Sequence, residues 1–423
     1  MDDSIAILGR QPALGLAELE SLYGADAVRP AGSQAARLRL APCSVDVARL
    51  GGTMKLCKLL TVLDTTKWPA IEQFLIGAAP TQATRMPEGK MHLGLSAYGT
   101  GVSPQQLLAA GLKLKKAIHA ASGRTVRLVP NKTAELNAAQ VLHNQLTRPN
   151  GWELVLIRDG MQTIVAQTVS VQDIDAYAAR DFGRPKRDAR VGMLPPKLAQ
   201  LLINLAIGPG EFAAVRDSLS GDVCRSADNA QKLRADHGRT TVLDPFCGTG
   251  VVLQEALLMG YHAYGTDLEP RMIDYSRTNL AWLAERRRLG DASPELAVGD
   301  ATTYQWQLPA DQPVAVASEA YLGRPFTGRP APEVLAQTMT DCNLIIKKFL
   351  RNVHDQLPAG ARLCLALPAW QVRPGEFRHL PLIDQLAEMG YNRVSFERIR
   401  DDDLLYYRAD QIVARQLLVI TRK

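Results

Sequence analysis

From Thr241 to the end of the chain, short apolar runs alternate with stretches of helical periodicity. Five of these runs end, in chain order, at Asp244, Asp267, Asp300, about Ser318 and Leu367. Strict alternation of strands and helices predicts an α/β fold with a parallel, doubly wound sheet. The last two runs, near 393–396 and 411–420, have no helix between them, which predicts an antiparallel pair.

The first 180 residues have a less regular pattern of short strands and helices. Apolar runs at 5–8 and 56–63, and an alternating run at 91–98, predict strands. Ser103 is placed to cap a helix over 104–121, and a turn at Asp159-Gly160 predicts a β-hairpin. We interpret this part as an α+β module with an antiparallel sheet, split into two small parts.

Leucine spacing predicts two further helices. The buried face of the first consists of Leu14, Leu16, Leu19 and Leu22, and that of the second of Leu198, Leu201, Leu202 and Leu205. Glu18 and Glu20 are expected to point outward from the first helix, and Pro195 and Pro196 suit the start of the second. The stretch before Pro195 is basic and non-periodic, which predicts a linker, and 208–240 predicts a surface loop.

Composition is that of an ordinary globular protein, with 46% apolar and 22% charged residues. No apolar run reaches the ~20 residues of a membrane helix, and the acidic start lacks a signal peptide's basic residues. The formal charge of +6 permits a polyanionic partner without requiring one. The six cysteines are scattered, which argues against a zinc site or a disulfide framework and favours a reducing cytoplasm.

A glycine turn lies between the first two strands of the alternating region. Gly248 and Gly250 allow a tight turn and the close approach of a ligand, and the helix after them offers free N–H groups. Asp267, nineteen residues after Gly248, is placed to accept hydrogen bonds from ribose hydroxyls. A dinucleotide fingerprint would have a third glycine where Leu253 stands. Cys247, within the turn, is interpreted as a small packing residue and not as a nucleophile.

The run DPFCGTG, together with Asp267, resembles the cofactor loop of class I S-adenosylmethionine methyltransferases, and is closest to that of RNA methylases with a THUMP domain. This resemblance implies that Asp244 lies under the methionine end of the cofactor, that Asp267 holds the ribose diol, and that Asp300 accepts from the adenine amine. Asp300 could instead only cap a helix. The cofactor-binding residues that we predict are Asp244, Phe246, Gly248, Gly250, Asp267, Leu268, Asp300 and Ala301.

Two N-terminal stretches carry a second resemblance. ILGRQPALGLAELESL resembles the start of archaeal and eukaryotic tRNA guanosine-10 N2-methyltransferases, and LKLKKAIHAASGRTVRLVPNK with ELNAAQVLHNQL resembles their THUMP domain, which binds the acceptor end of tRNA. A basic cluster lies here that suits phosphate contacts: Lys113, Lys115, Lys116, Arg124, Arg127 and Lys132. A solvated helix face is the alternative interpretation of the lysines.

The catalytic loop should follow the fourth strand, where such amino-group methylases carry Asp or Asn, Pro, Pro and Tyr. Here the stretch is Ser318-Glu319-Ala320-Tyr321-Leu322-Gly323, so the tyrosine and glycine match and the other three positions do not. Ser318 is a weaker acceptor than a carboxylate. We hypothesise that Glu319 orients the amine and that Tyr321 stacks on the base, as catalytic residues with Ser318.

The resemblance predicts four regions: a ferredoxin-like region at 1–80, a THUMP domain at 81–172, a linker at 173–195 and a class I (Rossmann-like) methyltransferase domain at 196–423. It implies a cytoplasmic enzyme that methylates N2 of a tRNA guanosine from S-adenosylmethionine, without a metal, and leaves open an activating partner subunit. The altered loop leaves two alternatives. One is an amino methylase of another RNA or DNA base, and the other an inactive RNA-binding protein with this fold.

Overall fold

The computed structural model describes residues 3–188, 194–209, 240–287, 289, 294–309, 311–326, 328, 330–373, 375–408 and 411–423. The chain divides into two compact units. The N-terminal unit comprises Met1–Leu16, Asp26–Ala48 and Gly52–Ala176, and the C-terminal unit comprises Ala17–Ala25, Arg49–Gly51 and Tyr177–Lys423. The surface loop predicted at 208–240 lies almost wholly outside the described residues.

The N-terminal unit contains one eight-stranded sheet. Its spatial order is β2 (Val28–Ala31), β3 (Ala35–Leu38), β1 (Ser4–Leu8), β4 (Thr53–Leu63), β8 (Gln162–Val171), β7 (Gly151–Asp159), β5 (Met91–Tyr98) and β6 (Val126–Leu128). Most pairs are antiparallel, but β5 runs parallel to both β6 and β7. The prediction of an antiparallel sheet is therefore incomplete, because a helical crossover after β5 returns the chain in the same direction.

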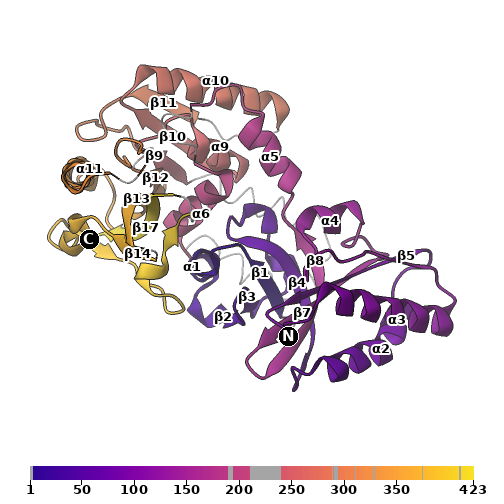
Figure 1. The fold of residues 1–423 in the computed structure, drawn as a ribbon. Coiled ribbons are helices and arrows are strands. Elements are labelled where there is room, and N and C mark those ends of the chain that lie inside the picture. The colour runs from indigo at the N-terminus through magenta and orange to yellow at the C-terminus, as the bar shows by residue number, and fades with distance from the viewer. Residues whose placement is uncertain are drawn as a thin grey trace. The chain divides into compact units, whose positions relative to one another are not determined.

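Two apolar clusters pack against this sheet. Helices α2 (Trp68–Thr84) and α3 (Pro104–Ser122) lie side by side and cover one cluster with β5, β6 and β7 (Figure 1). The other cluster joins β1, β3, β4, β7 and β8. The expected two parts therefore share a single continuous sheet. The Ser103 cap of α3 is confirmed, since Ser103 and Gln106 form a capping box. A short helix, α4 (Ala138–His143), follows β6.

Helix α1 (Pro12–Tyr23) shows a prediction that is wrong. Glu18 and Glu20 do not point into solvent but are buried. Glu18 accepts hydrogen bonds from the Gly51 N–H and the Asn204 side chain, both at 2.8 Å. Glu20 accepts from the backbone N–H groups of Glu397 and Arg398. Burial of these carboxylates is tolerated because they satisfy donors that would otherwise lack partners.

The sheet of the C-terminal unit has the predicted doubly wound form. Its order is β11 (Pro294–Val298), β10 (His262–Asp267), β9 (Thr241–Asp244), β12 (Val314–Glu319), β13 (Arg362–Arg373), β17 (Val413–Arg422) and β15 (Tyr391–Arg393), with β14 (Glu376–Arg378) on β13 and β16 (Leu405–Tyr406) on β17. The first five strands are parallel, whereas β17 is antiparallel to β13 and β15. This confirms the predicted antiparallel last strand.

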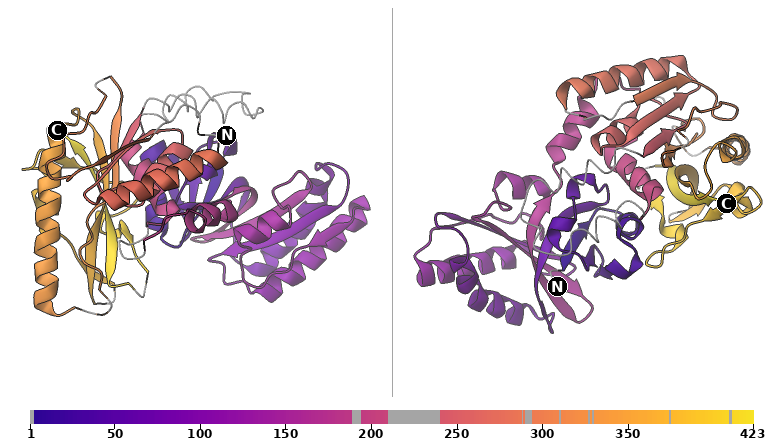
Figure 2. Two further views of the ribbon diagram at one scale, coloured as in Figure 1. Left: turned by 90° about the horizontal axis from the view of Figure 1, so that it is seen from above. Right: turned by 180° about the vertical axis from the view of Figure 1, so that it is seen from behind.

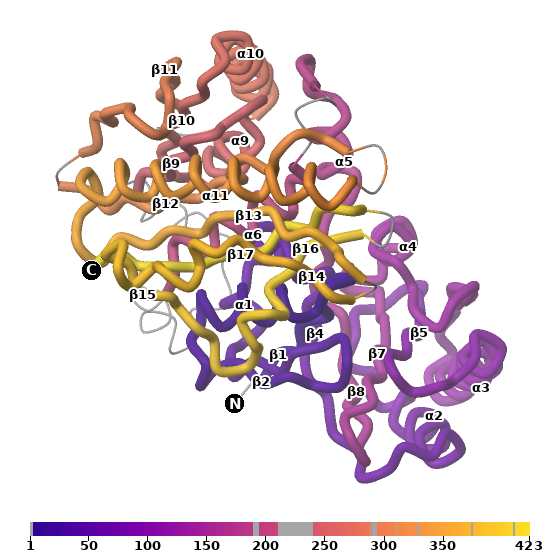
Figure 3. The backbone as a smooth tube through the Cα atoms, turned by 60° about the vertical axis from the view of Figure 1, so that its left-hand side comes forward, coloured from indigo at the N-terminus to yellow at the C-terminus, as the bar shows by residue number. Residues whose placement is uncertain are grey.

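Helices cover both faces of this sheet (Figure 2). Helices α6 (Pro196–Ile207), α9 (Val251–Leu258) and α10 (Pro270–Arg286) lie on one face, preceded in the chain by α5 (Ile174–Phe182). Helix α11 (Pro332–His354) runs along the other face, as Figure 3 shows, and its apolar side packs on β12 and β13. The four predicted leucines of α6 are buried. The chain passes from β9 to β10 on one side and later to β12 on the other, so a topological switch point lies at β9.

The cysteines differ in state. Cys57, Cys247, Cys342 and Cys364 are free and buried, whereas Cys43 is disulfide-bonded. The scattered spacing argued against a disulfide framework but did not indicate the bond at Cys43, because spacing along the chain does not determine spatial proximity. Of the helices in the described ranges, none is both long and apolar enough to cross a membrane.

Candidate functional site

A cavity of about 830 Å³ lies at the switch point of the C-terminal sheet. Its walls are the ends of β9, β10 and β12, the loops after them, and one side of α11. Ligands of open α/β sheets bind in this position, outside the carboxyl ends of the strands. The predicted residues that line it are Asp244, Phe246, Gly248, Asp267, Leu268, Asp300, Ala301, Glu319 and Tyr321.

The glycine turn forms the floor of the cavity. Gly248 and Gly250 have φ of +51° and +82°, in the left-handed region, and a Cβ on Gly250 would come within 2.9 Å of Ser276 Oγ. Ser276 Oγ in turn donates to the Gly248 carbonyl oxygen at 2.8 Å. The turn is thereby fixed against α10, and α9 begins directly after it at Val251. Burial raises the pKa of the Cys247 thiol well above its usual value, which suits the predicted packing role.

Asp267 fixes the turn from the neighbouring strand. One of its carboxylate oxygens accepts from the Gly248 N–H at 2.9 Å, and the other accepts from the Glu269 N–H at 3.0 Å. The residue is half-buried and lines the cavity, and burial raises its pKa. Each carboxylate oxygen has a second acceptor site. Asp267 can therefore accept from two neighbouring hydroxyl groups of a ligand.

Asp244 lies deeper in the cavity, with only 2% of its surface exposed. Its Oδ1 accepts from Ser318 Oγ at 2.6 Å and from the Phe246 N–H at 3.3 Å. Burial raises the pKa of Asp244 to about 7 in spite of these hydrogen bonds. A cationic group of a ligand would favour the charged form of this carboxylate.

The remaining predicted cofactor residues surround these two aspartates. Asp300 is exposed at the rim, and its Oδ1 accepts from the Thr302 N–H at 2.8 Å, as in a turn cap. Ala301 is buried, and Leu268 is 64% exposed. Phe246 packs edge to face on Phe349 of α11, with ring centroids 5.2 Å apart. Asp300 is thus placed both to cap the turn and to face the cavity.

The three predicted catalytic residues occupy different positions. Ser318 is fully buried, donates to Asp244 and is not among the residues that line the cavity. Glu319 lines the cavity and forms an ion pair with Arg415 of β17. Tyr321 lines the cavity and is 42% exposed, and burial of part of its ring raises the pKa of its hydroxyl. The structure therefore brings Glu319 and Tyr321, but not Ser318, to the cavity surface.

Sequence reasoning missed several contributors to this cavity. Leu344, Ile345 and Lys348 reach it from α11, and Leu194 and Thr249 also line it. The signal for the first of these was an apolar side chain on an otherwise polar helix face, since Leu344 is 51% exposed. Arg415 was missed because its partner lies 96 positions away in the sequence.

The predicted RNA-binding residues lie in the N-terminal unit, where two of them have internal partners. Lys113 forms an ion pair with Glu72 at 2.9 Å. Arg124 donates to backbone carbonyls in the last turn of α2 and after it, including that of Ala83 at 2.6 Å. The other four are exposed on α3, on β6 and in the loop after β6: Lys115, Lys116, Arg127 and Lys132. The Lys113 side chain is also exposed, at 55%, but its charge is paired with Glu72.

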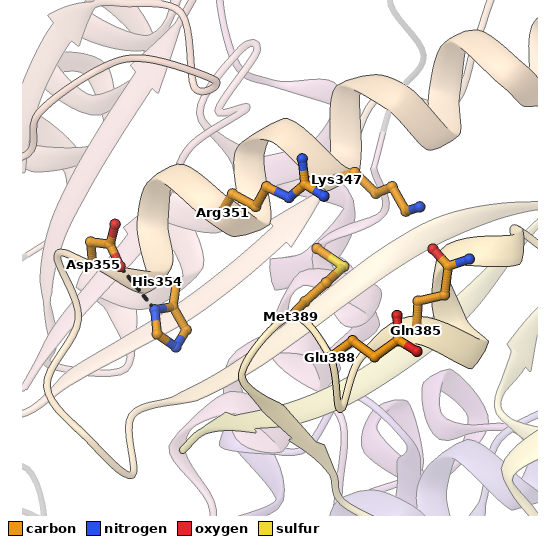
Figure 4. A pocket seen from close by; sticks show the side chains of 7 residues that line it. All are labelled: Lys347, Arg351, His354, Asp355, Gln385, Glu388 and Met389. Atoms are coloured by element: carbon orange, nitrogen blue, oxygen red, sulfur yellow. Dashed lines mark hydrogen bonds and ion pairs between the residues drawn. The ribbon is translucent and has the colours of Figure 1, made fainter.

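A second hollow of the C-terminal unit, of about 360 Å³, lies between α11 and the 3₁₀ turn at Pro381–Gln385 (Figure 4). It is lined by Lys347, Arg351, His354, Asp355, Gln385, Glu388 and Met389. Side chains of both charges face it, and His354 Nδ1 is 3.0 Å from Asp355 Oδ1. It contains none of the predicted residues and no strand end, so the switch-point cavity is the candidate site.

The strand order, the antiparallel last strand and the glycine turn define a class I methyltransferase fold in the C-terminal unit.

No family model matches the chain. The chain is similar to the tRNA (guanine(10)-N2)-dimethyltransferases of Methanothermobacter thermautotrophicus and Pyrococcus abyssi, which confirms the predicted resemblance. The first is 30% identical over 151 residues, 36% of this chain and 39% of the relative. The second is 26% identical over 200 residues, 46% of each chain. The matches therefore span less than half the length of these relatives.

Two solved structures align with this chain over nearly its whole length. TrmN from Thermus thermophilus is 18% identical, with a TM-score of 0.49 and coverage of 100% of both chains. SMU.472, a putative methyltransferase solved in complex with SAH, is 9% identical, with a TM-score of 0.48 and coverage of 100% of this chain and 98% of its own.

We predict that Asp244→Asn changes how the stability of the protein depends on pH. The pKa of this carboxyl rises from 3.8 to about 7 on folding, so between these values the folded protein holds a proton that the unfolded chain has released. Stability of the wild type therefore falls through this group as pH rises from about 4 to about 7, whereas asparagine does not titrate. The free energy of unfolding in urea, measured at pH 5 and pH 8, should shift in favour of the variant at pH 8. The shift should be of the order of a few kcal/mol. Parallel pH profiles would contradict the buried, protonated state.

Proposed function

We propose that the protein transfers a methyl group from S-adenosylmethionine to the exocyclic N2 amine of a guanosine in tRNA. The observation that carries this proposal is the convergence of Asp244, Asp267, Asp300 and Tyr321 on one switch-point cavity. Acceptors at the ends of three neighbouring strands suit a nucleoside with an amino-acid tail, and an exposed aromatic ring at the rim suits a base. Similarity to the two tRNA (guanine(10)-N2)-dimethyltransferases supports the choice of substrate.

The residues of the cavity fit this cofactor. Asp267 would accept from the ribose hydroxyls, Asp300 from the adenine amine, and Asp244 would face the ammonium end. The backbone of the turn at 246–250, with Leu268 and Ala301, would enclose the rest. When bound, S-adenosylmethionine supplies a methyl group on a positively charged sulfur. The proposed mechanism needs no metal.

Tyr321 and Glu319 would hold the base. The Tyr321 ring is placed to stack on a base that enters the cavity, and the Glu319 carboxylate is placed to accept from its amine. These contacts would aim the nitrogen lone pair at the methyl carbon. On methylation the amine would lose one proton, which Glu319 would accept and pass to water. Catalysis is then mainly by positioning. Ser318 contributes by holding Asp244.

The N-terminal unit would hold the RNA. We assign residues 1–80 to a ferredoxin-like region, 81–172 to a THUMP domain, 173–195 to a linker and 196–423 to the catalytic domain. Lys115, Lys116, Arg127 and Lys132 would contact phosphates. Lys113 and Arg124 would have mainly structural roles, because Glu72 and backbone carbonyls already engage them. In this proposal the protein acts in the cytoplasm on tRNA, with or without an activating partner subunit.

The direct test is transfer of labelled methyl from S-adenosylmethionine to unmodified tRNA transcripts, followed by nucleoside analysis. We expect N2-methylguanosine or its dimethylated form. Activity of the purified chain would show that a partner subunit is dispensable. Methylation of a different amino group would instead favour the second candidate, an amino methylase of another base. The departure of Ser318-Glu319-Ala320 from the Asp/Asn-Pro-Pro pattern motivates that candidate. Cofactor binding without turnover on any RNA or DNA would contradict both.

Substitutions at the cavity rim should lower the rate. Glu319→Gln replaces a charged acceptor by a weaker one, and Tyr321→Ala removes the stacking ring. Loss of one base–aromatic stack corresponds to about 10- to 100-fold in kcat/KM. Tyr321→Phe keeps the ring and should retain most of the activity. Wild-type rates in both Glu319→Gln and Tyr321→Ala would remove these residues from the reaction.

Neutralising exposed lysines of α3 should weaken tRNA binding. We expect that Lys115→Gln combined with Lys116→Gln raises Kd for tRNA and lowers the salt dependence of log Kd by up to about two units of slope. Lys113→Gln is the matched control, because Glu72 already neutralises that charge, and it should have a smaller effect. An unchanged salt slope in the double variant would show that these lysines form only a solvated helix face.

A further inference from the structure

We propose that Arg415 is a positioning residue for methyl transfer: it holds Glu319 so that one carboxylate oxygen faces the incoming amine. This inference rests on the proposed function and goes beyond it, because it adds a residue from the antiparallel last strand to the site. The guanidinium Nε of Arg415 donates to Glu319 Oε1, and both side chains are largely buried.

The strand register explains how these residues meet. Glu319 on β12 pairs with Ala366 on β13, and Ala366 pairs with Leu417 on β17. Paired residues share a face of the sheet, and Arg415 lies two positions from Leu417, so its side chain is on the same face as Glu319. The two strands are separated by one intervening strand, or about 10 Å. The long arginine side chain can span this distance because Ala366 between them is small.

The ion pair occupies only one side of the carboxylate. In the described part of the chain, hydrogen bonding to Glu319 is seen at Oε1 alone, so Oε2 is available to a ligand in the cavity. Ser318, at the position where the resemblance predicts an acceptor, is fully buried, and its hydroxyl donates a hydrogen bond to Asp244. The acceptor that reaches the cavity is therefore one residue further along β12, and Arg415 fixes the direction of its side chain.

Arg415 also offsets a concentration of negative charge. Glu319 shares its cavity with four other acidic residues, Asp244, Asp267, Glu269 and Asp300. A further carboxylate among these would be repelled, and its long side chain would turn towards solvent. The buried guanidinium, 8% exposed on β17, supplies the compensating charge. Without it we expect Glu319 to lose its fixed orientation.

The test compares methyl transfer to tRNA by wild type, Arg415→Met and Arg415→Lys, with binding of S-adenosylhomocysteine as the measure of an intact cofactor site. Arg415→Met should lower kcat by about 10- to 100-fold, as expected for a misplaced reacting group, with cofactor affinity and KM for tRNA little changed. Arg415→Lys, which keeps the charge, should recover part of kcat. Arg400→Met is the matched control, because it removes an exposed arginine that pairs with Asp403 away from the cavity.

A double-mutant cycle separates positioning from a structural role. In a Glu319→Gln background, Arg415→Met should have little further effect on kcat, because its target is already altered. An equal loss in both backgrounds, or wild-type kcat in Arg415→Met, would overturn the inference while leaving the proposed function intact. If Arg415→Met does not fold, the same cycle is run with Arg415→Lys and decides in the same way. If wild type methylates no RNA, the proposed function and this role fall together.

Discussion

The buried carboxylate of Asp244 is the constraint on which the arrangement of the site depends. At 2% exposure it is largely removed from water, so the chain must supply its hydrogen bonds. Ser318 Oγ and the Phe246 N–H do so. The first bond fixes the end of β12, and the second begins the glycine turn, whose Gly248 N–H then bonds to Asp267 on β10. These bonds hold the ends of β9, β10 and β12 and the glycine turn in place around Asp244.

Alternation along β12 extends this constraint to the part of the cavity where Glu319 lies. Successive side chains of a strand point to opposite faces, so Ser318, which bonds to Asp244, and Glu319 point in different directions. Glu319 lies at the cavity, and Arg415 reaches it across β13. In this arrangement the carboxylate of an aspartate at 318 would lie next to that of Asp244 and be repelled by it. One of the two carboxylates would have to be protonated, or the end of β12 would have to adopt a different conformation. The serine is compatible with the buried aspartate because it donates.

The features that lie close together in the sequence could be predicted from it. The parallel strands, the turn at Gly248 and Gly250, and the strand-end positions of Asp244 and Asp267 all follow from patterns within about thirty residues. The Glu319–Arg415 pair depends instead on strand order and register, which hydrophobic periodicity does not encode. Its one local signal was a charged residue within the apolar run IVARQLLVI, since an arginine buried in a strand requires a partner. The outward direction predicted for Glu18 and Glu20 was wrong for the same reason, because their donors come from distant segments.

The charges of the candidate site also bear on how a polyanion could be its substrate. Five acidic residues line the cavity, Asp244, Asp267, Glu269, Asp300 and Glu319, and their carboxylates would repel phosphates that entered it. Base extrusion avoids this repulsion, because only the uncharged base enters while the backbone stays outside. In the proposed reaction the same carboxylates would face the positive parts of the ligands: the ammonium and sulfonium groups of the cofactor and the hydrogens of the amine. Lys348 and Arg324, which also line the cavity and are exposed, would then meet the phosphates next to an extruded base. An acidic interior with cationic side chains among its exposed lining therefore suits the proposed transfer of a methyl group to a base.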